Sequence, residues 1–106
     1  MFMIRHYRLA NGRLPFRDWL MRLSDRQARV AVLRRIDRVA EGSFGEHRFV
    51  RDGVWEFKID VGPGYRVYYA MEGKAVILLL SGGSKRTQRQ DVDRAAGYWK
   101  EYRSRS

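Results

Sequence analysis

The sequence has no cysteine, only two prolines, only two histidines and no long apolar run. Without cysteine, disulfide bonds and thiolate metal sites are excluded, and a reducing compartment is expected. The first twenty residues lack the apolar core of a secretion signal, and no stretch is long and apolar enough to span a bilayer. We therefore expect a cytoplasmic protein that makes no use of a membrane.

Metal ligands and other cofactor motifs are equally scarce. Histidine, aspartate and glutamate do not cluster at metal-ligand spacing, so we expect neither a metal nor another cofactor. Cations, by contrast, are abundant: 22 Lys and Arg face 12 Asp and Glu, a formal charge of +10, and most of the cations are arginine. Such an excess favours a polyanionic partner, nucleic acid first, although an arginine-rich but functionally neutral surface would look the same. At 106 residues the chain fits a single domain, 1–106.

The most informative segment, residues 54–88, indicates three consecutive antiparallel strands. Residues 55–61 and 65–71 each alternate between apolar and polar side chains, which is typical of strands with one buried face. The run 75–80 is apolar throughout, as expected of a central strand covered on both faces. Turns are predicted at the glycines of 62–64 and 72–74.

The first of these turns sets the strand register. A three-residue turn would place Asp60 opposite Arg66 and Lys58 opposite Tyr68, and hydrophobic parity also allows a register shifted by two residues. The third strand runs back alongside the second, so a loop over 81–87 would emerge beside Arg66. This predicts a cluster at one end of the sheet made of Lys58, Arg66, Tyr68, Lys85 and Arg86.

The remaining elements complete an α+β domain. We expect a first edge strand, two helices, a loop over 42–53 and a C-terminal helix that begins after Thr87, in the order β-α-α-β-β-β-α. The sheet would be small and antiparallel, with about four strands, and the two N-terminal helices would pack on it. The second helix carries a long basic face, which is either a solvated surface or a docking surface: Arg26, Arg29, Arg34, Arg35 and Arg38.

Three motifs give the sequence a family resemblance. GPGYRVYY, the apolar strand before GGSK-x-TQ, and the early PF-x-x-WL-x-x-L resemble the RelE/ParE toxin superfamily, in its HigB-like branch of phage Gp49-like, addiction-module killer proteins. The resemblance extends from about Pro15 to Trp99. It implies a RelE-like fold and the toxin role of a type II toxin–antitoxin system.

The resemblance also implies partners and a choice of targets. A cognate antitoxin is expected, typically a small helix-turn-helix protein encoded by the neighbouring gene. RelE- and HigB-type toxins cut mRNA in the ribosomal A site, which makes the ribosome and mRNA the expected partners and the protein an endoribonuclease. ParE-type toxins instead inhibit DNA gyrase without nuclease activity. A plain nucleic-acid-binding module is a third possibility.

Individual residues match the family unevenly. Arg66 matches the sheet arginine that contacts the scissile phosphate, Lys58 a strand lysine, and Lys85 or Arg86 the basic residue after the last strand. A functional tyrosine expected near the start of the last helix is replaced here by Asp91 and Val92. The identity of the general acid and base therefore stays open.

Metal-free RNA cleavage requires a base for the 2′-hydroxyl, stabilisation of the phosphorane charge and an acid for the leaving oxygen. An arginine fork suits bidentate phosphate binding, which favours Arg66. Glu56 and Lys58 are rival bases, Tyr68 is either a base-stacking or a sheet residue, and His47 is a less favoured acid or base. The predicted catalytic residues are Arg66, Lys85, Lys58, Glu56 and Tyr68; the predicted RNA-phosphate contacts are Arg86, Arg51, Arg48 and Arg89.

Overall fold

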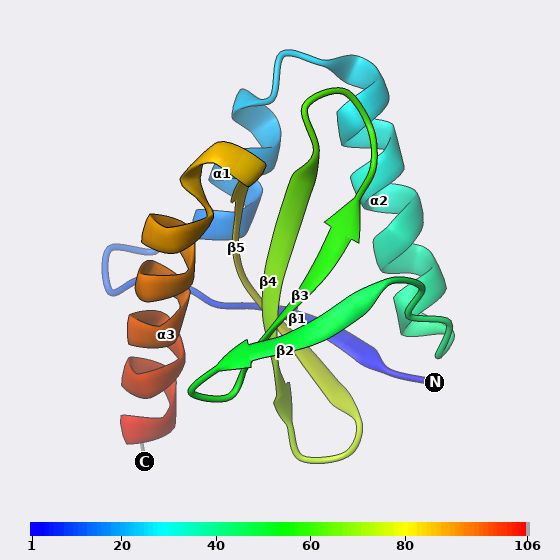
Figure 1. Cartoon of the computed structure of the whole chain (residues 1–106). Coiled ribbons are helices and arrows are strands. Elements are labelled where there is room, and N and C mark those ends of the chain that lie inside the picture. The colour runs from blue at the N-terminus through cyan, green and yellow to red at the C-terminus, as the bar shows by residue number, and fades with distance from the viewer. Residues whose placement is uncertain (106) are drawn as a thin grey trace.

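The computed structural model describes residues 1–105, which form a five-stranded sheet with helices on both faces (Figure 1). The elements in chain order are β1 (Met3–His6), α1 (Pro15–Arg22), α2 (Arg26–Ala40), β2 (His47–Arg51), β3 (Val54–Ile59), β4 (Tyr65–Glu72), β5 (Val76–Ser84), the 3₁₀ turn η1 (Lys85–Thr87) and α3 (Gln88–Ser104). The α+β class and the two N-terminal and one C-terminal helices are as predicted. Across residues 1–105 no helix combines the length and the apolar composition needed to cross a membrane.

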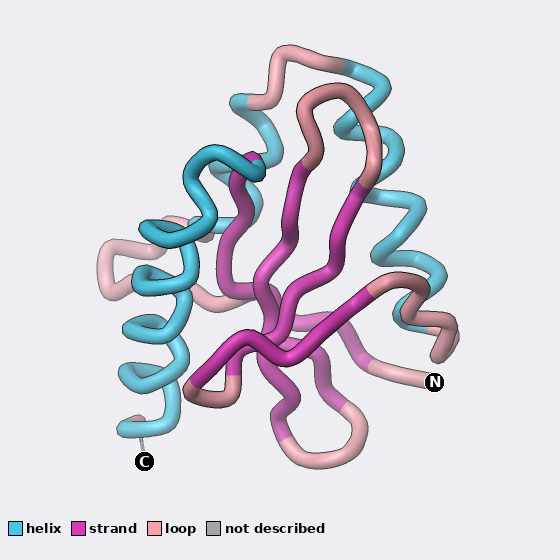
Figure 2. Tube along the Cα trace, viewed as in Figure 1, coloured by secondary structure: helices cyan, strands magenta, loops and turns pink. Residues whose placement is uncertain are grey.

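The sheet is mixed, with the strand order β1-β5-β4-β3-β2 (Figure 2). The prediction of about four antiparallel strands was wrong in two ways. The edge strand β1 pairs parallel with β5, and β2 occupies part of the segment predicted to be a loop. A tight turn joins β2 to β3 through Asp52 and Gly53, whose positive φ angles of 51° and 83° suit a two-residue hairpin.

The register between β3 and β4 is the alternative shifted by two residues. Lys58 lies opposite Arg66 and Glu56 lies opposite Tyr68, so the predicted pairing of Asp60 with Arg66 was wrong. The reason is the length of the connection, because β3 ends at Ile59 and a longer loop follows it. A shift of two residues leaves every side chain on the same face of the sheet, so the apolar residues of both strands still face the core.

Each face of the sheet has its own hydrophobic core. On one face α1 and α2 cover the strands, with Phe16 and Val32 packed against Phe57 and Val67. On the other face α3 packs through Val92 and Ala95. Because β5 lies between these two layers, consecutive side chains enter alternate cores, which explains its continuous apolar run.

The strand β5 extends to Ser84, so the loop predicted to begin at residue 81 was wrong. A bulge between β4 and β5 precedes two glycines that stay within the strand. A Cβ on Gly82 would overlap the ring of Trp19, and one on Gly83 would overlap the Asp91 carboxylate. These glycines therefore allow α1 and α3 to approach the strand closely from opposite faces.

Candidate functional site

Polar side chains form two cross-strand rows on the face of the sheet that α3 covers. One row pairs Lys58 with Arg66. The other pairs Arg48 with Glu56, and Glu56 with Tyr68. Because β2, β3 and β4 are neighbours in the sheet, the two rows lie side by side. The predicted clustering of Lys58 and Arg66 thus arises from direct strand pairing.

Glu56 is the centre of a hydrogen-bonded charge network. It is 2% exposed, and its Oε2 accepts from Arg66 Nε at 3.0 Å and from Arg48 Nε at 2.9 Å. Its Oε1 accepts from Gln88 Nε2, at the start of α3, at 3.1 Å. Two cations and an amide therefore compensate the buried carboxylate, as a buried charge requires. With both oxygens engaged, Glu56 orients arginines and is poorly placed to act as a general base.

Next to this network lies a depression of about 250 Å³, which we call the basic hollow. Its lining residues come from β2, β3, β4 and the approach to β2: Glu46, His47, Arg48, Glu56, Lys58 and Arg66. Lys58 Nζ stands 3.7 Å from the Glu46 carboxylate, a loose and partly exposed pair. The hollow thus combines one amine with two guanidinium groups.

The two arginines are held in a way that leaves their terminal nitrogens free. Both bind Glu56 through Nε, and across residues 1–105 the Nη atoms of Arg48 and Arg66 have no hydrogen-bond partner. The Arg66 side chain is 9% exposed and fixed, whereas Arg48 is 63% exposed and able to move. The free Nη pair of a guanidinium can grip two oxygens of one phosphate.

His47 lines the basic hollow from β2, where sequence reasoning had expected a loop. Its Nδ1 is 3.0 Å from the carbonyl oxygen of Gly45. A carbonyl oxygen only accepts, so Nδ1 is the donor in this contact. Phe44 and Trp55 flank the ring, with centroids 5.0 and 5.8 Å away. Its partner across the hairpin is Phe57, a residue of the core beneath α1 and α2, so the His47 ring lies toward that face and not toward Lys58 and Arg66. No local pattern in the sequence marked this position.

Tyr68 does not reach the surface. Its side chain is fully buried between the sheet and α3, and its hydroxyl has no hydrogen-bond partner across residues 1–105. Burial raises the pKa of the Tyr68 hydroxyl, and the nearby Glu56 and Asp91 carboxylates raise it further. A buried ring cannot stack on an RNA base, so the interpretation of Tyr68 as a sheet residue fits this position better.

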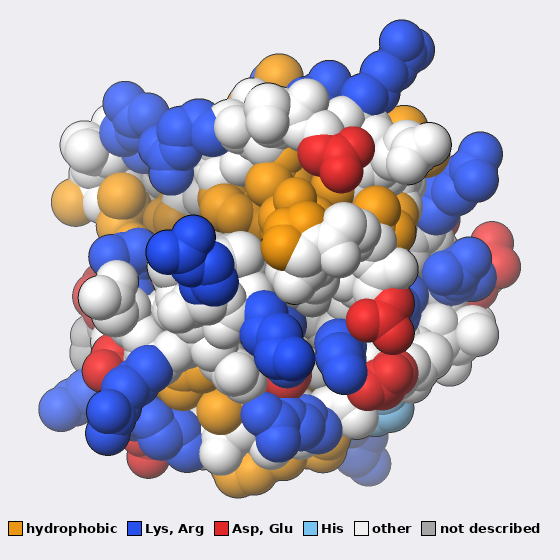
Figure 3. All heavy atoms as spheres, turned by 45° about the horizontal axis from the view of Figure 1, so that its top comes forward, with side chains coloured by type: hydrophobic (Ala, Val, Ile, Leu, Met, Phe, Trp, Pro, Cys, Tyr) orange, Lys and Arg blue, Asp and Glu red, His pale blue; other side chains and the backbone are white. Residues whose placement is uncertain are grey.

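The predicted residues after β5, Lys85 and Arg86, do not line the basic hollow. The Lys85 backbone N–H donates to the carbonyl oxygen of Gly64 at 3.1 Å, which ties η1 to the β3–β4 loop. Lys85 and Arg86 therefore follow the strand that pairs with Arg66, as the sequence suggested. Both side chains are exposed. Lysine and arginine side chains are spread over the whole face of the molecule drawn in Figure 3.

Two other predicted phosphate contacts lie elsewhere. Arg51, at the end of β2, forms ion pairs with Asp52 and with Asp93 of α3. Arg51 and Arg89 line a separate shallow depression between β2 and α3. Of the four arginines predicted to contact RNA phosphate, Arg48 alone lines the basic hollow.

The basic face of α2 is partly committed to structure. Arg35 donates from Nε to the Phe44 carbonyl oxygen at 3.0 Å and from Nη2 to that of Glu46 at 2.7 Å. Arg29 donates to the carbonyl oxygen of Leu23. Arg35 thereby fixes the segment that precedes His47 and positions one wall of the basic hollow.

Acidic and histidine side chains do not form a metal cradle in the part of the chain that the structure describes. Across residues 1–105 no three of them come together in a way that could hold a metal ion. The groups that line the basic hollow are guanidinium, ammonium, imidazole and carboxylate side chains.

Comparison with known proteins gives two findings. The profile of a family described as "Phage derived protein Gp49-like" matches residues 18–97. An uncharacterized protein of Haemophilus influenzae is 40% identical over 82 residues, which cover 77% of this chain and 83% of that protein. The matched family range contains every residue that lines the basic hollow.

Proposed function

The chain belongs to the phage-derived Gp49-like family, a family of the toxin–antitoxin, addiction-module type, and from this premise we propose that it is a toxin that cuts messenger RNA on the ribosome without a metal ion. The observation that carries the proposal is the basic hollow, a space of about 250 Å³ lined by an amine and by two guanidinium groups whose Nη atoms have no hydrogen-bond partner within residues 1–105, with His47 also in the lining. That space suits a phosphodiester group.

The arginines would bind and stabilise the reacting phosphate. Arg66, fixed by Glu56, presents its Nη atoms at a defined position, and Arg48 closes over the phosphate from the exposed side. Charge that develops on the phosphorane oxygens is stabilised best by donors that are already oriented, since no reorganisation is then required during the reaction. Lys58, which has only a loose partner, can turn toward the same oxygens or protonate the leaving oxygen.

His47 is our proposed general base, because both oxygens of Glu56 are already engaged by Arg48, Arg66 and Gln88. His47 lies in the lining of the hollow at its β2 edge, and its exposed ring packs against Phe44 and Trp55, so the side chain must turn about its χ angles to bring Nε2 to the phosphate. In the proposed step Nε2 takes the proton of the 2′-hydroxyl, the 2′-oxygen attacks the phosphorus, and the bond to the 5′-oxygen breaks as that oxygen gains a proton from Lys58. The products are a 2′,3′-cyclic phosphate and a 5′-hydroxyl.

The size of the basic hollow supports a requirement for the ribosome. Its lining holds a phosphate by charge but surrounds too little space to enclose flanking bases. A nuclease that holds only the phosphate depends on another body to align the 2′-oxygen with the leaving oxygen, and alignment contributes a large share of the rate. The ribosomal A site would supply that alignment.

The test is primer extension on cellular mRNA after brief induction of the protein. Wild type should give codon-phased cuts, and His47→Gln and Arg66→Lys should each lose most of them while remaining folded by circular dichroism. Arg26→Ala, an arginine at the start of α2 and outside the hollow, is the matched control and should cut like wild type. Normal cutting by folded His47→Gln and Arg66→Lys variants would refute the assignment of this site.

A second candidate function is inhibition of a protein target such as DNA gyrase. It is favoured by exposed apolar side chains on α2, where Val30 is 39% and Leu33 is 50% exposed, among arginines. Such a mixed apolar and basic helix face is typical of protein-binding surfaces. In the induction experiment this function would give DNA damage with intact mRNA, and a plain nucleic-acid-binding module would give neither.

The proposed toxin role includes a cognate antitoxin, expected as a small helix-turn-helix protein from the neighbouring gene. Shielding the basic hollow would block phosphate binding directly, and docking on α2 would block access to the ribosome by steric exclusion. Electrostatic attraction to a chain of charge +10 would speed association with an acidic partner segment. Charge reversal at Arg34 and Arg38 together separates the two docking modes, since it should weaken only the second.

A further inference from the structure

We propose that the groove between α1 and α3 binds an extended, acidic peptide segment of a partner protein as an added strand on the free edge of β5. We call this site the edge groove. It is distinct from the basic hollow, and the proposal does not depend on any nuclease activity. Three observations carry it: an unpaired stretch of strand, an unpartnered buried hydroxyl, and arginines on both walls.

The first observation is that β5 is longer than the strand beside it. β1 pairs with β5 from Val76 to Leu79, and the backbone N–H of Tyr7 makes the last contact, with the Leu79 carbonyl oxygen, at 3.0 Å. β5 continues to Ser84 with β4 on one side. Within residues 1–105 no strand covers its other side beyond that point. Backbone donors and acceptors on a free edge are a template for another chain.

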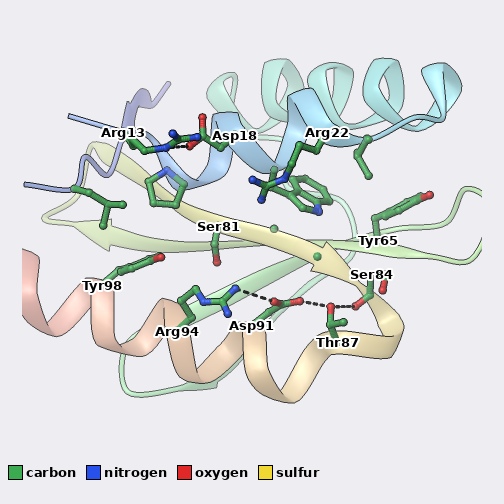
Figure 4. A pocket seen from close by; sticks show the side chains of 16 residues that line it. Arg13, Asp18, Arg22, Tyr65, Ser81, Ser84, Thr87, Asp91, Arg94 and Tyr98 are labelled. Carbon is green, nitrogen blue, oxygen red and sulfur yellow. Dashed lines mark hydrogen bonds and ion pairs between the residues drawn. The ribbon is translucent and has the colours of Figure 1, made fainter. Parts of the chain in front are cut away.

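The second observation is the shape of the space beside that edge. A groove of about 550 Å³ runs over residues 81–84, with α1 on one side and α3 on the other (Figure 4). Trp19 and Asp91 close over Gly82 and Gly83 from the two faces of the sheet, while the strand edge between them lies open to the groove. Four residues of added strand would extend about 13 Å, the length of this stretch.

The third observation is an orphaned polar group in the floor of the groove. Ser81 is 6% exposed, and its Oγ has no hydrogen-bond partner across residues 1–105. Its side chain lies in the middle of the groove and points toward α3 (Figure 4). A buried hydroxyl without a partner is unfavourable, so a ligand that supplies a hydrogen bond at this position relieves an existing cost.

The charges of the walls define the partner as acidic. Three arginines and two aspartates line the groove. Asp18 is paired with Arg13, and Asp91 lies 3.8 Å from Arg94, whereas Arg22, on α1, has no carboxylate within ion-pair distance across residues 1–105, which leaves a net positive lining. Successive side chains of an added strand point to opposite sides, so one set would meet Arg22 and Trp19 and the other Arg94 and Tyr98. Acidic side chains with apolar stems fit both walls.

A peptide fits this edge better than RNA does. A strand edge presents both N–H donors and carbonyl acceptors, and a peptide backbone provides the matching groups at the matching spacing. A phosphate group provides acceptors only and would leave the carbonyl groups of the edge unpaired. The occupant is therefore a polypeptide segment.

The test uses the full chain labelled with ¹⁵N and a capped seven-residue peptide of alternating glutamate and valine. Titration should produce saturable shifts and slower exchange at the amides of residues 80–84. A peptide of the same sequence with every backbone nitrogen methylated cannot pair with a strand and should not bind. Replacing glutamate by lysine in the peptide should weaken binding at least tenfold.

Variants locate the charge requirement. Arg22→Glu combined with Arg94→Glu should weaken the glutamate peptide about tenfold and strengthen the lysine peptide, whereas Arg26→Glu, with the same charge change on α2, should alter neither. Three results would each overturn the proposal: no saturable shift at residues 80–84 with millimolar peptide, equal binding of the methylated peptide, or stronger shifts of the same amides by a seven-nucleotide RNA. Messenger RNA cleavage should persist in the Arg22→Glu, Arg94→Glu variant, which keeps this outcome separate from that of the proposed nuclease.

Discussion

The basic hollow lies on β2, β3 and β4, whereas the edge groove lies along the free edge of β5, and the polar groups of the two regions differ in how they are paired. In the hollow, Glu56 binds Arg66, Arg48 and Gln88, so the charges are paired before any ligand arrives. In the groove, Ser81 Oγ and Arg22 have no partner across residues 1–105, and a strand edge lies open. In the hollow the buried charges are already paired in the free protein, whereas in the groove a hydroxyl, an arginine and a strand edge still lack partners within residues 1–105.

This difference has a physical consequence for the ligand that each region can take. Pre-paired arginines keep their geometry in the free protein, which suits brief binding of a charged group that reacts and leaves. Unpaired polar groups and a free edge gain most from a ligand that stays, since each new hydrogen bond removes an existing penalty. Turnover therefore fits the hollow and stable association fits the groove.

We expect the largest change in stability when the ion pairs of Glu56 in the hollow are removed. Glu56→Ala leaves Arg66 buried without its counter-charge and should lower the free energy of unfolding by about 3–5 kcal/mol. Urea denaturation measures the change, with Asp60→Ala, an exposed acid on the same strand connection, as the control of near-zero effect. The double variant Glu56→Leu, Arg66→Met should recover much of the loss. If Glu56→Ala and Asp60→Ala unfold alike, the network does not stabilise the fold.

We expect the next largest change in stability when a side chain is added at Gly82, where α1 contacts β5 closely. Gly82→Ala drives a methyl group into the ring of Trp19 and should cost about 1–3 kcal/mol. Gly97→Ala is the matched control, because its methyl group meets open space in the middle of α3 and should stabilise by about 0.5–1 kcal/mol. Thermal melts of both variants give the comparison. Equal melting temperatures would mean that the α1 contact with β5 is looser than described.

A smaller effect separates the two arginines of the hollow. Arg48 and Arg66 share one Glu56 oxygen, but Arg48 is 63% exposed. Arg48→Ala should therefore change the free energy of unfolding by only about 0–1 kcal/mol, while reducing the slope of log affinity for single-stranded RNA against log salt by about 0.7. An unchanged slope would remove Arg48 from the phosphate contacts.

The smallest effect concerns the two unpartnered hydroxyls. Ser81→Ala and Tyr68→Phe each remove a buried group that binds nothing, so at pH 7 stability should stay within about 0.5 kcal/mol of wild type or rise slightly. Burial raises the pKa of Tyr68 above its unfolded value, so its contribution is complete below pH 10 and declines as the pH rises above that. Tyr68→Phe should then flatten the loss of stability between pH 10 and 11, measured by urea denaturation. Ser81→Ala should leave that alkaline loss unchanged and weaken the glutamate peptide.

The strands that cross the centre of the sheet could be predicted from sequence because their side chains obey a simple period. Alternation defined β3 and β4, and the apolar run defined β5. The same alternation put Lys58 and Arg66 on one face, and the structure pairs them directly. β2 was missed because His47–Arg51 is an edge strand with little burial, so it lacks the pattern that burial imposes.

The sequence by itself determined the α+β class, the set of side chains that share a face on each central strand, and the basic character of the chain. These properties depend only on local periodicity and composition. The tertiary structure alone decided the two-residue register shift, the reach of β5 through Gly82 and Gly83, and the place of His47 in the lining of the basic hollow. Each of these depends on loop length or on contact between distant segments, and no local pattern encodes either. The same holds for the edge groove, which exists because β1 ends at His6 while β5 continues to Ser84.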